Sequence, residues 1–157
     1  MTQPLIVQKY GGTSVGSIDR ISKVAERIIT AKNEGKQLVV VVSAMSGETN
    51  RLLGLAKQID NVPDARELDV LLSAGEQISM ALLAITLNKM GYPARSLTGT
   101  QANIVTDNQH NDAVIKHIDV SPITELLLQD QIVIVAGFQG MTEKGDITTL
   151  GRGGSDT

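Results

Sequence analysis

Three short runs of the chain, at residues 5–7, 38–42 and 132–135, are apolar without alternation and rich in β-branched residues. Runs of this kind are typical of strands that are covered on both faces. Between the first two runs, apolar residues recur at helical spacing over residues 18–34, and Gly35 ends that segment. The order strand, helix, strand predicts a crossover between parallel strands. We therefore expect an α/β fold, a three-layer sandwich with a mainly parallel central sheet and helices on both faces.

The remaining segments predict further helices and short strands between turns. We expect helices at 50–59, 67–90, 112–117 and 121–129, and short strands at 94–97 and 104–106. The long helix is expected to be buried and interrupted near Gly75. The last helix is expected to have Ser121 as its N-cap and Pro122 at its first position. Six of the 15 glycines fall between residues 137 and 154, which predicts flexible, turn-rich sequence there.

Composition narrows the class of partner. The 157 residues contain no cysteine, 2% aromatic residues and a net charge of −3. Without cysteine there is no disulfide or thiolate site, which fits a cytoplasmic protein. The charge and the scarcity of aromatic residues favour neither double-stranded nor single-stranded nucleic acid as a partner. We expect no signal peptide and no membrane span, and a small molecule as the partner. We also expect His110 and His117 at the surface, with no metal site, because neither has ligand neighbours at suitable spacing.

A glycine-rich loop, Lys-Tyr-Gly-Gly-Thr-Ser-Val-Gly-Ser at residues 9–17, lies between the first predicted strand and the first predicted helix. Adjacent glycines let backbone N–H groups approach an anion, and the helix N-terminus adds partial positive charge. Gly11 and Gly16 have the spacing of a P-loop, but Ser17 stands where that motif needs lysine. Lys9 instead precedes the glycines. A phosphate cradle and an ordinary strand-to-helix turn are equally open interpretations of this loop.

A second loop, Ser-Ala-Met-Ser-Gly-Glu-Thr-Asn at residues 43–50, follows the second predicted strand. Ligands of open parallel sheets bind beyond the carboxyl ends of the strands. Hydroxyl side chains beside Gly47 would suit a carboxylate or a phosphate there. Taken alone, however, this loop is better explained by helix capping through Ser46 or Thr49.

Two charged residues stand in unusual surroundings. Glu76 lies in the most apolar helical stretch, so its carboxylate needs a cation or a cleft. An internal salt bridge explains it as well as a functional site does. Arg152 stands among glycines in residues 148–157, where its planar guanidinium group suits a carboxylate. A solvated surface turn is the less favoured alternative for Arg152.

Taken in order, the segments 9–15, 42–50, 72–76, 137–140 and 149–157 resemble the aspartokinases, which are members of the amino acid kinase family. The resemblance covers residues 1–157 and implies the amino-terminal, aspartate-binding part of an amino acid kinase domain. It implies transfer of the γ-phosphoryl group of ATP to the β-carboxylate of L-aspartate, the first step of lysine, threonine and methionine biosynthesis. The complete enzyme is expected to be a homo-oligomer.

The nucleotide-binding half and the regulatory ACT domains of that family have no counterpart in these 157 residues. The chain is therefore expected to be a fragment without activity of its own. Loss of the second half is also expected to expose apolar surface near residues 132–135 and to promote self-association.

The resemblance also implies roles for individual residues. Lys9 is implied as catalytic, with Asp156 to orient it. The residues implied for ATP, which would bind with Mg²⁺ in the complete enzyme, are Lys9, Tyr10, Gly11, Gly12 and Ser43. The residues implied for aspartate are Ser43, Gly47, Thr49, Glu76, Arg152, Gly153, Gly154 and Ser155. Glu76 would bind the α-ammonium group and Arg152 the α-carboxylate.

Two alternatives stay open at this point. The first is another amino acid kinase, acting on glutamate, carbamate or a nucleotide. The second is a non-catalytic module that binds an amino acid or another partner.

Overall fold

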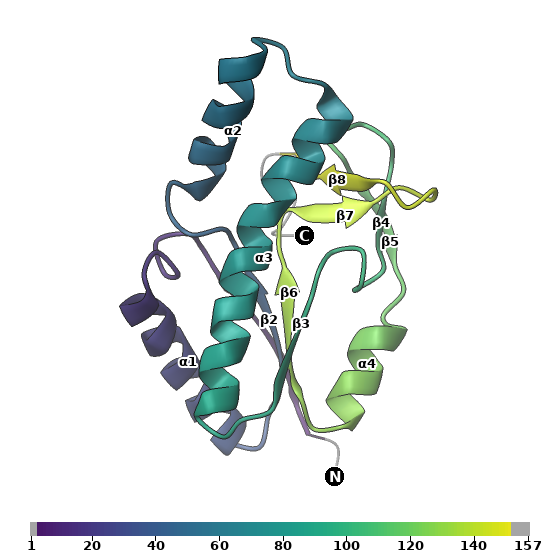
Figure 1. Ribbon diagram of the computed structural model, residues 1–157. Coiled ribbons are helices and arrows are strands. Elements are labelled where there is room, and N and C mark those ends of the chain that lie inside the picture. The colour runs from purple at the N-terminus through teal and green to yellow at the C-terminus, as the bar shows by residue number, and fades with distance from the viewer. Residues whose placement is uncertain (1–2, 152–157) are drawn as a thin grey trace.

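The computed structural model describes residues 3–151 (Figure 1). In these residues the elements follow the order β1 (Leu5–Tyr10), α1 (Ile18–Asn33), β2 (Gln37–Val42), α2 (Glu48–Ile59), α3 (Ala65–Lys89), β3 (Ala94–Leu97), β4 (Ile104–Thr106), β5 (Ile115–Ile118), α4 (Ser121–Leu128), β6 (Ile132–Ala136), β7 (Gln139–Met141) and β8 (Ile147–Thr149). Helix α3 runs beside α1 and α2, and α4 lies on the other side of the strands (Figure 1).

The central sheet has the strand order β1-β2-β6-β3, and all its pairings are parallel. Successive side chains of a strand point to opposite faces, and at β2 and β6 both faces are covered. Val40 and Ile134 pack in one core with α1 and α3. Their neighbours Val39 and Val133 pack in a second core with Leu127 of α4. This arrangement explains the continuous apolar runs at 38–42 and 132–135 and confirms the expected three-layer architecture.

The apolar surface of the sheet does not lie where we expected it. Strand β6 lies between β2 and β3, and its residues 132–135 are at most 4% exposed. The expectation of exposed apolar surface at these positions is therefore wrong. The exposed side chains belong instead to β1, the edge strand of the described sheet, where Leu5 is 53% and Val7 64% exposed. The expectation that residues 5–7 are covered on both faces is also wrong.

A second, smaller sheet has the strand order β5-β4-β7-β8. The helix expected at 112–117 is wrong, because residues 115–118 form β5 and pair antiparallel with β4. The glycine-rich segment is not a flexible loop up to residue 151, since β7 and β8 form an antiparallel hairpin. Gly140 allows β7 to lie close to β4, because a Cβ atom there would come within 2.8 Å of the carbonyl oxygen of Ile104.

Helix α3 is continuous, contrary to the expected interruption near Gly75. A Cβ atom at Gly75 would lie 2.9 Å from the Cβ of Ala44, so glycine lets the helix approach the loop after β2. The helix is long and apolar enough to cross a membrane, but it packs against α1, α2, β3 and β8 as the central core helix. At α4, Val120 is the N-cap, one residue before the expected Ser121.

Candidate functional site

The loops that follow β1 and β2 lie side by side because these two strands are parallel neighbours. Ser43 N–H donates to the carbonyl of Tyr10 at 3.0 Å, and Ser46 N–H donates to the carbonyl of Gly12 at 3.1 Å. A Cβ atom at Gly12 would lie 3.0 Å from the carbonyl oxygen of Ala44, so glycine permits this close approach. At the end of the first loop, Ser17 caps α1 through a bond from Arg20 N–H. Ser17 therefore serves the helix at the position where a P-loop has its lysine.

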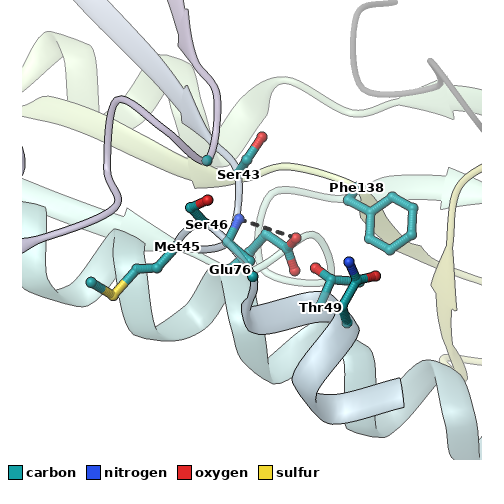
Figure 2. A pocket seen from close by; sticks show the side chains of 10 residues that line it. Ser43, Met45, Ser46, Thr49, Glu76 and Phe138 are labelled. Atoms are coloured by element: carbon teal, nitrogen blue, oxygen red, sulfur yellow. Dashed lines mark hydrogen bonds between the residues drawn. The ribbon is translucent and has the colours of Figure 1, made fainter. Parts of the chain in front are cut away.

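A cavity of about 330 Å³ opens between these loops and α3 (Figure 2). It lies beyond the carboxyl ends of the parallel strands, where open α/β sheets bind their ligands. Its lining comes from the loops after β1 and β2, the start of α2, the middle of α3 and the residue after Gly137. The lining residues are Gly12, Ser43, Ala44, Met45, Ser46, Gly47, Thr49, Asn50, Glu76 and Phe138.

Glu76 supplies the carboxylate of this cavity and is 2% exposed. Its Oε1 accepts a hydrogen bond from the Ala44 N–H at 3.3 Å, and its Oε2 has no hydrogen-bond partner among residues 3–151. Burial raises the pKa of Glu76 to about 7, and nearby donors, among them its own backbone N–H and that of Ala44, offset part of that effect. No salt bridge to Glu76 is found in the described part of the chain. The cleft interpretation of Glu76 is therefore favoured over the internal ion pair.

The start of α2 forms another part of the cavity wall. Gly47 is its N-cap with φ of 81°, and no side chain caps this helix. Capping by Ser46 or Thr49, the alternative explanation of this loop, is therefore not found. Both residues line the cavity instead. In Figure 2 the Glu76 carboxylate points to the side of the cavity where Thr49 and Phe138 lie. The site thus combines one buried carboxylate with hydroxyl groups and a helix N-terminus.

Lys9 lines a second cavity of about 400 Å³, which is mostly apolar and lies over β1, β2 and β6. Phe138 lines both cavities and so lies at their junction. Its φ of 67° is unusual for a residue other than glycine. Phe138 lies in the segment 137–140, but its sequence predicts no role for it. Phe138 follows a parallel strand, β6, just as the two loops of the site follow β1 and β2. This position after a predicted strand is the signal that would have identified it.

The other residues expected at the site are placed differently. The side chain of Tyr10 packs in the core and donates to Gln8 Oε1 at 2.9 Å, and burial raises its pKa. Gly11 is exposed and does not line the cavity. The structure thus brings together Gly12, Ser43, Gly47, Thr49 and Glu76. Arg152, Gly153, Gly154, Ser155 and Asp156 lie outside the described residues.

A polar cluster beside β8 was missed from the sequence. Its centre is Asp69 on α3, which is 0% exposed and accepts bonds from His110, Asn111 and Thr149. The expected surface position of His110 is therefore wrong, since its side chain is only 16% exposed and its Nδ1 lies 2.7 Å from Asp69 Oδ2. Across residues 3–151 no group of three or more His, Cys, Asp or Glu side chains is placed to hold a metal ion.

Comparison with known proteins places these observations in a family. The model of the amino acid kinase family matches residues 4–157. An aspartokinase of Geobacillus stearothermophilus is 60% identical over 153 residues, which are 98% of this chain and 38% of that protein. An aspartate kinase of Pseudomonas putida is also 60% identical, over 98% of this chain and 37% of its own length. The chain thus spans less than two fifths of these relatives.

Solved structures show the same fold. The aspartate kinase of Synechocystis superposes with a TM-score of 0.81 at 46% identity, over 98% of this chain and 25% of that one. Aspartokinase III of E. coli, solved in complex with aspartate and ADP, superposes with a TM-score of 0.78 at 25% identity, over 98% of this chain and 45% of that one.

Proposed function

The chain belongs to the amino acid kinase family, and we propose that it forms the aspartate-binding part of an aspartate kinase. The proposed reaction transfers the γ-phosphoryl group of ATP to the β-carboxylate of L-aspartate. Because the chain spans only 38% of a relative that is 60% identical to it, we assign the complete reaction to the complete gene product. We place that product in the cytoplasm and expect it to be a homo-oligomer.

The observation that carries this proposal is that Glu76 is buried and that its Oε2 has no hydrogen-bond partner among residues 3–151. A buried carboxylate with an oxygen that lacks a partner is costly unless a ligand supplies a positive charge. The α-ammonium group of an amino acid meets this need, with three donors on one charged atom. Ser43 and Thr49 in the same cavity offer hydroxyl groups to the remaining polar atoms of a small ligand. The 60% identity to aspartokinases favours aspartate among the amino acids.

The chemistry needs no general base in this site. The β-carboxylate of aspartate has a pKa of about 4 and is already ionised at neutral pH. The task of the protein is to hold this anion close to the phosphates of ATP against their mutual repulsion, through positioning and electrostatic stabilisation. We propose that Lys9 supplies the positive charge that stabilises the phosphates. We propose that the backbone N–H groups of Gly11 and Gly12, in the loop after β1, donate hydrogen bonds to them. The buried side chain of Tyr10 leaves only its main chain for this role.

Several assignments rest on the resemblance alone. We propose that Arg152 binds the α-carboxylate of aspartate, that Gly153, Gly154 and Ser155 complete this site, and that Asp156 orients Lys9. ATP is proposed to bind with Mg²⁺, which would neutralise phosphate charge. The part of the chain that the structure describes offers no cluster of acidic ligands for that ion, so we assign Mg²⁺ no ligands in it.

A phosphorylation assay of the complete gene product tests the proposal. Release of ADP is measured with aspartate, glutamate, carbamate or no acceptor, and the acyl phosphate is trapped with hydroxylamine. We expect turnover with aspartate alone among these acceptors. Turnover with glutamate or carbamate in its place would identify another amino acid kinase. Binding of aspartate without any turnover would identify a non-catalytic amino-acid-binding protein.

A further inference from the structure

Asp69 is buried at the centre of a set of donors that the proposed chemistry does not use. His110 Nδ1 lies 2.7 Å from its Oδ2, and Asn111 Nδ2 donates to its Oδ1 at 2.5 Å. The backbone N–H of Asn111 donates to both oxygens at 3.2 Å. Thr149 Oγ1 donates to Oδ1 at 2.5 Å. Asp69 thus joins α3 to the loop before Ala113 and to β8, two segments that are far apart in sequence.

The two segments that Asp69 binds are also bonded to each other. Ala113 N–H donates to the carbonyl of Thr149 at 3.0 Å, and Gly151 N–H donates to the carbonyl of Ala113 at 3.1 Å. A Cβ atom at Gly151 would collide with the carboxylate of Asp112. The helix, the loop and the strand therefore form a closed ring of contacts. Asp69 holds the helical side of this ring.

The ring ends at the cavity that contains Glu76. Leu150 N–H donates to the carbonyl of Phe138 at 2.8 Å, and Phe138 lines the cavity. Asp69 and Glu76 are seven residues apart in one continuous helix, which is about 10 Å along the axis and almost two full turns. Both carboxylates therefore lie on the same face of α3, and one rigid element fixes the distance between them.

We infer that Asp69 is a positioning residue for aspartate, because through Thr149 it holds the end of β8 and the Phe138 wall at a fixed place relative to Glu76. This inference rests on the proposed function. It adds a residue that touches no substrate. Loss of the bond between Asp69 and Thr149 is expected to lower kcat/KM for aspartate, because small displacements in a binding site change affinity and rate strongly.

A matched pair of variants in the complete gene product separates positioning from stability. Thr149→Val keeps the shape of the side chain and removes only its bond to Asp69. Thr148→Val is the control, because Thr148 is also 0% exposed and its hydroxyl bonds Thr106 Oγ1 at 2.7 Å, away from Asp69. We expect Thr149→Val to lower kcat/KM for aspartate by about tenfold or more and to change the KM for ATP by less than about twofold. The control should leave both constants near those of the unmodified protein.

Two further variants keep the test decisive. Thr149→Ser retains the hydroxyl and should restore the constants for aspartate. If Thr149→Val does not fold, Thr149→Ala replaces it, because alanine also removes the hydroxyl that binds Asp69 and places no methyl group against the carboxylate. An unchanged kcat/KM for aspartate in Thr149→Ala would then overturn the inference.

The outcomes also separate the inference from the proposed function. Equal losses in Thr149→Val and Thr148→Val, or no recovery in Thr149→Ser, would overturn the positioning role while the unmodified protein stays active. An unmodified protein that neither binds nor phosphorylates aspartate would overturn the proposed function and this inference together.

Discussion

Glu76 on α3 accepts a hydrogen bond from the backbone N–H of Ala44, whose nitrogen lies 3.3 Å from Oε1. Three residues further along the helix, Ser79 Oγ donates to the carbonyl of Ser43 at 2.7 Å. The loop after β2 is therefore bonded to α3 at two consecutive residues, Ser43 and Ala44. The other oxygen of Glu76 has no partner among residues 3–151 and remains for a ligand in the cavity.

Replacing Glu76 by glutamine tests whether this oxygen binds an ammonium group. Glu76→Gln keeps the shape of the side chain and removes its charge. In the complete gene product we expect it to weaken aspartate binding by about tenfold or more, since a charge-assisted bond is lost. Succinate lacks the ammonium group and serves as the control ligand in calorimetry. Equal weakening of both ligands, or none for either, would contradict the role of Glu76.

The raised pKa of Glu76 makes aspartate binding depend on pH. An ammonium group binds the ionised carboxylate, and burial places the pKa of the empty site at about 7. Aspartate affinity should therefore fall as the pH drops below that value, by at most about tenfold per pH unit. Glu76→Gln should remove this dependence. Calorimetric titrations of both proteins between about pH 5.5 and 8.5 provide the measurement, and parallel profiles would count against the assignment.

The same raised pKa affects the stability of the protein without ligand in the opposite direction: aspartate affinity should rise with pH, whereas the free energy of unfolding should fall. The pKa of Glu76 is higher in the folded protein than the ordinary value of 4.5 for a glutamate side chain, so the folded state binds more protons between pH 4.5 and about 7. The contribution of Glu76 to the free energy of unfolding is thus full below pH 4.5 and is lost as the pH rises through about 7. Relative to Glu76→Gln, the unmodified protein should lose on the order of 3 kcal/mol across this window. Chemical denaturation at several pH values measures it.

Lys9 is expected to act on phosphoryl transfer rather than on aspartate binding. In the complete gene product, Lys9→Ala should leave the affinity for aspartate nearly unchanged and lower turnover by orders of magnitude, because its charge stabilises the transition state. Steady-state kinetics and aspartate calorimetry on the same preparation provide both values. A rise in the KM for ATP with unchanged turnover would make Lys9 a simple binding group.

Two helical glycines form a matched pair for stability. Alanine at Gly75 would bring its Cβ to 2.9 Å from the Cβ of Ala44, whereas alanine at Gly54 in α2 would meet nothing within 4 Å. We expect Gly75→Ala to lower the free energy of unfolding by about 1–3 kcal/mol, the usual effect of overpacking. Gly54→Ala should raise it by up to about 1 kcal/mol through helix propensity. Denaturant unfolding of both variants would show whether close packing or helix propensity decides at Gly75.

The central sheet was predictable because its strands carry their own signal. Every residue of β6 is buried, so its sequence is apolar on both faces. Strand β5 has no such signal, since Ile-Lys-His-Ile is largely exposed and becomes a strand only by pairing with β4. The apolar sequence of β1 correctly indicated a strand but wrongly indicated that both of its faces are covered. Sequence gives no sign that one face of an edge strand is left uncovered.

The candidate site was predictable at positions where a residue differed in polarity or size from its neighbours in sequence. Glu76 stood out as a charge in apolar sequence, and Gly12 and Gly47 stood out in loops after predicted strands. Asp69 gave no such contrast, because it follows Arg66 and Glu67 in the first turns of the helix. Its burial depends on donors that only the folded chain brings together.

The single uninterrupted helix that carries both Asp69 and Glu76 limits how the length of this chain can vary. One inserted residue between them would turn Glu76 by about 100° around the helix axis and remove it from the cavity. Every side chain of the site would still be present in such a variant, and the site would nevertheless be lost. The connection at residues 60–64 between α2 and α3 has exposed residues and no comparable constraint. Insertions and deletions should therefore be accepted there and rejected between positions 69 and 76.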